Sequence, residues 1–336
     1  MATIHDVARV AGVSISTVSY ALSGKRTIGA ATRDRIDAAV AELGYRPNAG
    51  ARMLAGTRTN ILALSAPLHA DTYAPAHMTF VLAIAEAARD FDYDTVLLVQ
   101  DEAVNGLRRM VSSKLVDGIV ALDIDHDDAR VPLLRELDIP ATLVGIPGDT
   151  SGLTCVDLDF EAAARLSLER LVALGHRSVG LIGHPDELYE RGSNFPIRFR
   201  DSFEAEATAL GVDSLVVTPD QEPAAVRAAF ERLRSELPGL SAIVLNCNEP
   251  VHTMLLELLR EKGLGVPSDL SIVSACSSFP TDQLDPPLDV IPLPAQITGR
   301  RGVELTLSQL AGYTTPVVEL VAPSYVGKGS TAPVTT

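Results

Sequence analysis

Residues 3–23, TIHDVARVAGVSISTVSYALS, constrain the fold of this chain more than any other stretch. Thr3 has a hydroxyl that can accept a hydrogen bond from the backbone N–H near Asp6, so it is a suitable N-cap for a first short helix. Gly12 supplies the backbone freedom that a sharp turn needs, and Ser14 can cap a second helix. The stretch therefore predicts two short helices joined by a tight turn, which is the helix-turn-helix arrangement.

The apolar residues of this stretch recur at helical spacing and leave one face of the second helix free. In chain order they are Ile4, Val7, Ala8 and Ala11, then Val18, Ala21 and Leu22. The side chains expected to point outward from the second helix are Ile15, Ser16, Ser19 and Tyr20. Such a face can enter the major groove of DNA. Taken alone, the pattern also fits two surface helices of a larger domain.

The residues that follow favour the first interpretation. A third helix is expected from about residue 31 to 43, ended by Gly44, and it would close a three-helix core. The loop before it places Lys25 and Arg26 where they can meet a DNA backbone phosphate. Residues 47–56 begin with a proline and end with a glycine, the signals of a helix start and stop. So short a segment is expected to be only marginally helical alone.

The distribution of charge supports a nucleic-acid partner for the first part of the chain only. The net charge of the 336 residues is −15, with 28 basic and 43 acidic side chains. Residues 1–60 nevertheless hold 8 basic against 4 acidic side chains. A small basic head on a large acidic body suits a head that touches phosphates and a body that does not.

From residue 60 onward, apolar strand-like runs alternate with helical segments, which predicts parallel sheets built from βαβ units. The expected strands lie at 61–67, 95–100, 118–122, 141–146, 178–183, 215–219, 242–246, 271–275, 289–294, 317–321 and 324–326. The expected helices lie at 79–91, 106–116, 128–137, 160–174, 197–210, 223–236, 250–262 and 296–310. The pattern predicts two successive α/β subdomains, the first completed by the end of the chain.

Several function classes find no support in the sequence. No apolar run is long enough to span a membrane, and no signal peptide opens the chain, so a cytoplasmic location is expected. Cys155, Cys247 and Cys276 have neither metal nor disulfide spacing, and we expect them to be reduced core residues. No motif of a hydrolase, metalloprotease or nucleotide-binding enzyme occurs, and no cofactor is expected. His184 and Asp186 lack a matching nucleophile and are interpreted as loop residues.

On three stretches the chain resembles the LacI/GalR family of bacterial transcriptional regulators. They are DVARVAGVSISTVSYALSG, TRDRIDAAVAELGYRPN, and ARMLAG as the hinge. The body resembles periplasmic sugar-binding proteins. The resemblance implies an all-α headpiece, a body of two doubly wound parallel-sheet subdomains, and a homodimer on a near-palindromic operator in double-stranded DNA. A small effector, often a sugar, would bind between the subdomains and change operator affinity. No apolar heptads close the chain, so a dimer rather than a tetramer is expected.

The resemblance sets the expected domain boundaries. They are 1–46 for the headpiece, 47–59 for the hinge, 60–158 with 292–326 for the first subdomain, 159–291 for the second, and 327–336 for a disordered tail. The alternative is a cytoplasmic protein that binds a small molecule such as a sugar without specific DNA readout. It would explain the body but not the basic head.

The resemblance also implies DNA contacts. The positions that match base-reading residues are Ile15, Ser16 and Tyr20. None of the three can make a bidentate charged contact to guanine, whereas Ile15 can pack on a thymine methyl group. The positions that match phosphate contacts are His5, Ser14, Thr17, Ser19 and Ser23, with Asn48 in the hinge. Leu54 matches the hinge leucine that wedges into a central base step from the minor groove.

The effector residues implied by the resemblance lie in the body. Arg200 matches the arginine that opens the effector helix of the second subdomain, and Asn248 with Glu249 matches an Asn-Asp pair near the cleft. Cys276, Ser277 and Gly145 stand where sugar-binding relatives have aspartates, which leaves fewer strong acceptors for sugar hydroxyls. Other side chains expected to line the cleft are His77, Asp123, Phe195 and Phe279.

Overall fold

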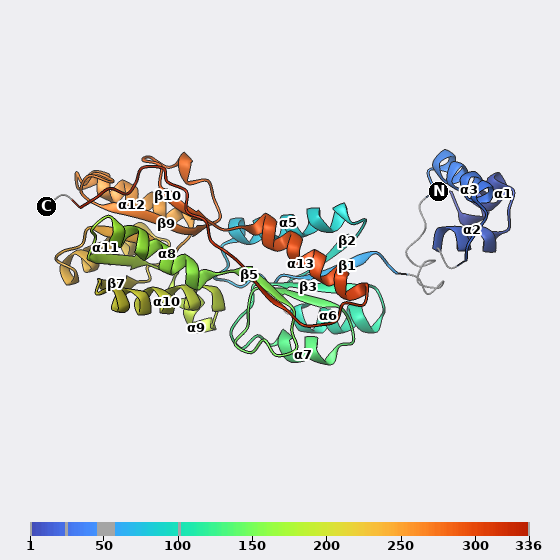
Figure 1. Ribbon diagram of the computed structural model, residues 1–336, viewed down its shortest axis with the longest axis horizontal. Coiled ribbons are helices and arrows are strands. Elements are labelled where there is room, and N and C mark those ends of the chain that lie inside the picture. Colours follow the sequence, from blue (N-terminus) through green and yellow to red (C-terminus); the bar gives the residue numbers. More distant parts are fainter. Residues whose placement is uncertain (1, 24–25, 46–57, 100–101, 335–336) are drawn as a thin grey trace.

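The computed structural model describes residues 2–23, 26–45, 58–99 and 102–334. Its first part is a three-helix headpiece of α1 (Ile4–Ala11), α2 (Ile15–Ser23) and α3 (Ala30–Leu43) (Figure 1). The expected caps of the first two helices are present. The Thr3 hydroxyl accepts from the backbone N–H of Asp6 at 3.4 Å, and Gly12 takes a left-handed φ of +65° at the turn. Apolar side chains from all three helices meet in one small core.

The body of the described chain contains two all-parallel sheets. The first is six-stranded in the order β11-β5-β4-β3-β1-β2, and the second is five-stranded in the order β10-β9-β8-β6-β7. The strands of the first sheet are β1 (Ile61–Ser65), β2 (Asp94–Leu98), β3 (Gly118–Leu122), β4 (Ala141–Val144), β5 (Cys155–Leu158) and β11 (Val318–Val321). Those of the second are β6 (Ser178–Ile182), β7 (Asp213–Val217), β8 (Ala242–Leu245), β9 (Ser271–Ser277) and β10 (Asp289–Pro292).

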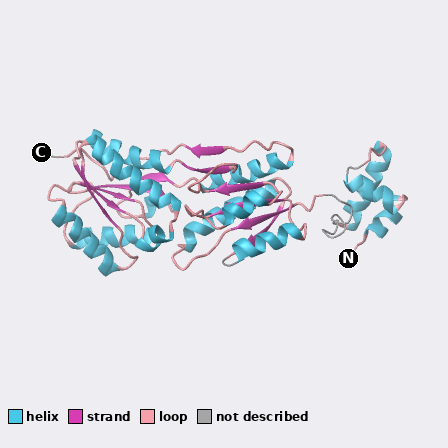
Figure 2. Cartoon of the chain, turned by 90° about the horizontal axis from the view of Figure 1, so that it is seen from below, coloured by secondary structure: helices cyan, strands magenta, loops and turns pink. Residues whose placement is uncertain are grey.

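Helices cover both faces of each sheet, so each subdomain has two apolar layers (Figure 2). The first subdomain carries α5 (Ala74–Asp90), α6 (Glu102–Ser112), α7 (Arg130–Glu136) and α13 (Ala295–Leu310). The second carries α8 (Phe160–Ala173), α9 (Asp186–Arg191), α10 (Asn194–Leu210), α11 (Pro223–Glu236) and α12 (Glu249–Glu261). Helices α5 and α13 lie side by side on one face of the first sheet (Figure 1). No helix in the described ranges is both long and apolar enough to cross a bilayer.

The expected fold class is confirmed, and the differences concern short elements. Strand β5 was not expected, because its four residues lie among acidic ones that favour a helix start. Helix α9 was not expected either, because its six residues hold little apolar periodicity. Helix α5 begins at Ala74 rather than near residue 79, with Pro75 in its first turn, where the missing N–H of proline costs nothing.

The end of the chain corrects two expectations. Residues 327–334 are ordered, because the buried carboxylate of Asp289 accepts from backbone N–H groups of this segment. The hydroxyl of Ser330, fully buried, donates to the carbonyl oxygen of Ile272 at 2.6 Å, and Val334 donates to Leu174 at 3.0 Å. The strand-like residue Val326 pairs with β10 of the second sheet rather than with the first. The segment that we expected to be a tail is therefore a strap across the second subdomain (Figure 1). The part of the chain that completes the first subdomain, α13 and β11, comes before this strap.

Candidate functional site

The exposed face of α2 is the candidate DNA-binding surface. The side chains of Ile15 and Tyr20 are 41% and 38% exposed, although both are large and apolar or aromatic. The Ser14 hydroxyl accepts from the backbone N–H of Thr17 at 3.2 Å and lies 2.8 Å from the Ser16 hydroxyl. The guanidinium of Arg26 lies over the Tyr20 ring, 5.6 Å from its centroid. The cap thus holds the start of α2, and a cation stands beside its aromatic side chain.

The other expected DNA contacts are only partly within the described residues. His5 is exposed on α1, and Ser19 is half-buried on α2. Lys25, Asn48 and Leu54, the hinge segment, and the side chain of Ser23 lie outside what the structure describes.

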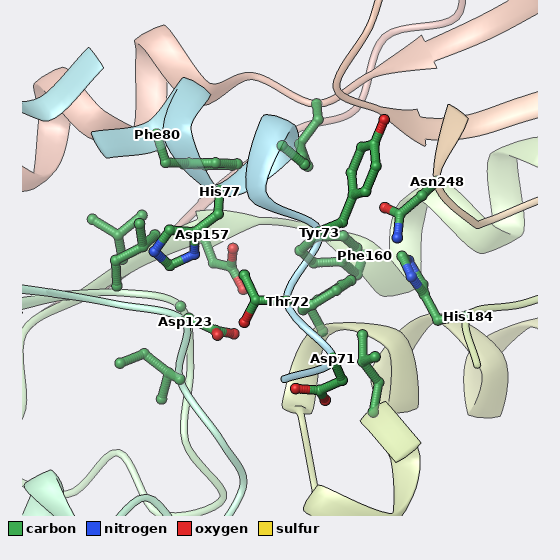
Figure 3. A pocket seen from close by; sticks show the side chains of 18 of the residues that line it. Asp71, Thr72, Tyr73, His77, Phe80, Asp123, Asp157, Phe160, His184 and Asn248 are labelled. Carbon is green, nitrogen blue, oxygen red and sulfur yellow. The ribbon is translucent and has the colours of Figure 1, made fainter. Parts of the chain in front are cut away.

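A cavity of about 140 Å³ lies between the two subdomains (Figure 3). Four aromatic side chains line it, namely Tyr73, Phe80, Phe160 and Phe195. The polar side chains of the lining are Asp71, Thr72, His77, Asp123, Asp157, His184, Arg191 and Asn248. This cavity is smaller than typical ligand pockets, which hold roughly 300–1,000 Å³. The two subdomains that form it therefore stand close together in this structure.

An ion-pair cluster joins the subdomains beside the cavity. Arg191, at the end of α9 in the second subdomain, donates through Nε to Asp71 Oδ2 at 3.0 Å and through Nη1 to Asp125 Oδ1 at 2.5 Å. Its Nη2 lies 3.7 Å from Asp123 Oδ2. Burial alone would lower the pKa of Arg191. The three carboxylates of the first subdomain outweigh burial and hold that pKa above its ordinary value. Main-chain bonds accompany the cluster, such as that from His126 N to Gly192 O at 2.7 Å.

A second cluster fixes Asp157, the cavity carboxylate at the end of the first sheet. Arg198 of α10 donates to Asp157 Oδ2 at 2.7 Å and to both carboxylate oxygens of Glu161 at 2.8 and 2.7 Å. Burial raises the pKa of Asp157 to about 6 in spite of the adjacent guanidinium. The guanidinium groups of Arg191 and Arg198 are therefore both bound to carboxylates of the protein itself.

Two histidines of the lining carry ring nitrogens without a partner. His77 on α5 is 8% exposed and His184 after β6 is 7% exposed. Within the described residues, Nε2 of His77 and Nδ1 of His184 have no hydrogen-bond partner. Burial lowers the pKa of His77 and lowers that of His184 to about 4, so both rings are neutral at pH 7. The His184 ring meets Phe195 edge-on, with centroids 5.2 Å apart.

The structure brings only some of the expected effector residues to the cavity. Those that line it are His77, Asp123, Gly145, Phe195 and Asn248. In the described lining, Arg200, Glu249, Cys276, Ser277 and Phe279 do not occur. The Arg200 guanidinium instead lies 2.8 Å from Asp201 Oδ1 and over the ring of Tyr189, while its neighbour Phe199 is fully buried in the core.

Two of the remaining expected residues lie behind the wall of the cavity. Phe279 meets His252 edge-on with centroids 4.9 Å apart, and Ser277 bonds to Ser274. The ring nitrogens of His252 lie 3.1 Å from the carbonyl oxygen of Asn248 and 2.7 Å from the Ser274 hydroxyl. These residues therefore hold the backbone that carries the cavity amide.

Sequence reasoning missed Asp71, Tyr73, Asp157, His184 and Arg191. Most of them follow or end a parallel strand, and the carboxyl ends of parallel strands are where α/β sheets bind ligands. That signal was available for Asp71, Tyr73 and His184, which follow expected strands, but not for Asp157, whose strand β5 the sequence does not predict. Arg191 gave no such signal, because it lies on a short helix that the sequence pattern does not indicate.

Comparison with known proteins gives two family matches. Residues 3–48 match the model of bacterial regulatory proteins of the lacI family, and residues 168–331 match that of a periplasmic binding protein-like domain. The chain is 27% identical over 338 residues to the HTH-type transcriptional regulator CelR of Thermobifida fusca, covering 96% of both chains.

Solved structures match over nearly the whole chain. A complex of transcriptional regulator CelR with cellobiose superposes with a TM-score of 0.69 at 25% identity, covering 98% of this chain and 100% of that one. The Lac repressor dimer bound to operator and the anti-inducer ONPF superposes with a TM-score of 0.80 at 24% identity, covering 98% and 99%. The second likeness shows the shared fold of headpiece and body.

Proposed function

The chain belongs to the LacI family of bacterial transcriptional regulators, and from that premise we propose that it is a repressor controlled by a small molecule. It binds a near-palindromic operator as a homodimer, on the nucleoid of the bacterial cytoplasm. A carbohydrate or related metabolite binds in the cavity between the subdomains. The observation that carries this proposal is the union, in one chain, of a capped recognition helix with an exposed face and a cavity formed by two subdomains.

The headpiece contacts divide into two kinds. Ile15 packs on a thymine methyl group, while the hydroxyls of Ser16 and Tyr20 bond base edges in the major groove. His5, Ser14, Thr17, Ser19, Ser23, Lys25, Arg26 and Asn48 contact phosphates, which fix the register without reading sequence. Leu54 inserts into the minor groove at the centre of the site.

The composition of the cavity supports a carbohydrate. Aromatic rings offer flat apolar faces, and carboxylate and amide groups offer hydrogen bonds of fixed direction, as in small-molecule sites generally. The cellobiose complex of CelR supports the same class of ligand. Because a ligand shifts an equilibrium only by its differential affinity for two states, the effector must favour one spacing of the subdomains.

Selection from a random DNA pool with the full-length protein tests the regulator directly. We expect enrichment of one near-palindromic sequence and a steep fall of affinity with rising salt. Sedimentation of the free protein should show a dimer. If no sequence is enriched at any salt concentration, the chain is a sugar-binding protein without specific DNA readout, and the proposal is wrong.

A further inference from the structure

The charged groups around the cavity carry an excess of negative charge. Its described lining contains the carboxylates of Asp71, Asp123 and Asp157 and, as its one cation, the guanidinium of Arg191. That guanidinium already contacts three carboxylates, counting Asp125 outside the lining. Asp157 likewise has its cation, Arg198, which also binds Glu161. No cation that lines the cavity is therefore left to receive an anionic ligand.

A negatively charged ligand would be held close to several carboxylates. Charges a few ångströms apart interact far more strongly at partly buried sites than in water, so this repulsion is not screened away. The ligand would also have to take Arg191 from partners at 2.5 and 3.0 Å. The lining thus disfavours phosphorylated and carboxylated compounds.

The unpartnered atoms of the lining point to a different kind of group. A buried nitrogen without a partner is destabilising, and a ligand that supplies the partner recovers that free energy. In a neutral imidazole each nitrogen is either a donor or an acceptor, depending on the tautomer. A hydroxyl group satisfies both cases because it donates and accepts, whereas an ionised phosphate or carboxylate group only accepts.

His77 and His184 come from opposite sides of the cavity. His77 lies on α5 of the first subdomain, and His184 follows β6 of the second, with the rings of Tyr73 and Phe160 between them in Figure 3. One ligand that bonds both nitrogens bridges the subdomains.

We propose that the effector of this cavity is a hydroxyl-bearing ring compound without negative charge, and that His77 and His184 each hydrogen-bond one of its hydroxyl groups from opposite subdomains. The inference rests on the proposed function, because it takes the cavity to be the effector site. It adds that phosphorylated sugars and sugar acids are excluded.

Matched sets of sugars test the charge. The full-length protein is titrated calorimetrically with glucose, galactose, mannose, ribose and cellobiose, and with the 6-phosphates and uronates of the hexoses and ribose 5-phosphate. We expect at least one neutral sugar to bind, and its charged counterpart, where the set has one, to bind at least tenfold more weakly. A charged member that binds as tightly as its neutral parent overturns the inference, as does a set in which no neutral sugar binds.

Variants test the two histidines with whichever neutral sugar binds. His77→Phe and His184→Phe keep a ring of similar size and remove the unpartnered nitrogen. His77→Phe also removes the hydrogen bond between that ring and the backbone of Ala66, so the Tm of each variant is measured beside its sugar affinity. Each should weaken sugar binding at least tenfold, while Tyr313→Phe, at an exposed ring outside the cavity lining, should bind as the parent does. Parental affinity in both histidine variants would overturn the assignment.

DNA selection separates the inference from the function on which it rests. If an operator is enriched but no neutral sugar binds, the inference fails and the DNA-binding function stands. If no operator is enriched, the proposed function itself fails.

Discussion

Arg191 of the second subdomain donates through Nε to Oδ2 of Asp71 in the first subdomain, at 3.0 Å, and so connects the two across the cavity. Asp123 and Asp125 also contact the Arg191 guanidinium, so three carboxylates of the first subdomain surround one cation of the second subdomain. All four side chains are at least three-quarters buried. The cluster therefore contributes directly to the closed arrangement of the body.

Replacement of Arg191 should open the body. In Arg191→Gln the three carboxylates lose their cation and repel one another, and breaking a buried pair from one side costs on the order of 3 kcal/mol. We expect a larger radius of gyration in small-angle X-ray scattering and a lower Tm. Arg200→Gln is the control, because its ion pair with Asp201 lies within one helix. Superimposable scattering curves for Arg191→Gln and the parent would contradict this role.

A methyl group at Gly145 should disturb the cavity wall. Gly145 has a φ of +128°, and a Cβ atom there would lie 2.8 Å from Cγ1 of Ile124, which also lines the cavity. Gly145→Ala should lower stability by about 1–3 kcal/mol through backbone strain and displace Ile124. Denaturant unfolding measures the loss. Gly312→Ala is the control, because Gly312 has a positive φ but open space around it, so this variant has backbone strain without a clash. Equal losses of stability in the two variants would show that the clash with Ile124 contributes nothing.

Loss of the Asp289 carboxylate should release the C-terminal strap. Burial alone would raise the pKa of Asp289, but hydrogen bonds from Thr331, Tyr325 and the backbone hold it below its ordinary value. Its Oδ1 accepts from the amides of Gly329 and Ser330 at 2.7 and 3.1 Å. In Asp289→Ala both acceptor oxygens are lost, and hydrogen bonds to a charged group are each worth about 1.5–3 kcal/mol. Hydrogen exchange of residues 328–330 should become much faster, and unchanged protection would show that the strap is held elsewhere.

The two headpiece side chains Tyr20 and Arg26 should give different binding phenotypes. Tyr20→Ala should change which operator is selected, because we propose that this exposed side chain bonds base edges. Arg26→Ala should weaken binding to all sequences and lower the salt slope by about one, because phosphate contacts carry no sequence information. Selection from a random DNA pool decides, and an unchanged preference for Tyr20→Ala would rule out its base-reading role.

The first helix should lose stability in acid. Hydrogen bonds from the side chain and backbone of Thr3, then from Arg9, lower the pKa of Asp6 to about 2 from 3.8. Because the folded-state pKa is depressed, this stabilisation is fully present above about pH 4 and is lost as the pH falls through about 2. NMR titration of Asp6 in the full chain should show the low midpoint, and Thr3→Ala should move it toward 3.8. A midpoint that Thr3→Ala leaves in place would show that the capping box does not cause the shift.

The headpiece and the order of the body were predictable because their signals are local. Caps such as Thr3 and Ser14 lie three residues from the N–H groups they accept, and alternation of apolar strands and helices fixes a parallel sheet. The strap was not predictable, because residues 328–330 contain no apolar pattern and find their acceptor in Asp289, some forty residues earlier.

The cavity was predictable only in part. Asp123 and Asn248 follow strands, so their position at the sheet edge could be inferred. Arg200 was chosen by resemblance, whereas Arg191 reaches the cavity through a turn of six helical residues that depends on tertiary contacts with the first subdomain. Packing of the chain between Arg191 and Arg200 decides which of the two arginines enters the cleft. A local sequence pattern does not encode this packing.

The strap also sets the order in which the protein can fold as it is synthesised. The headpiece needs only the first forty-five residues and can be complete while most of the chain is still being translated. Neither half of the body has that freedom, since the first awaits α13 and β11 and the second awaits Ser330. A ribosome that stalls late therefore leaves a polypeptide whose headpiece is complete while both halves of its body still lack the segments that complete them.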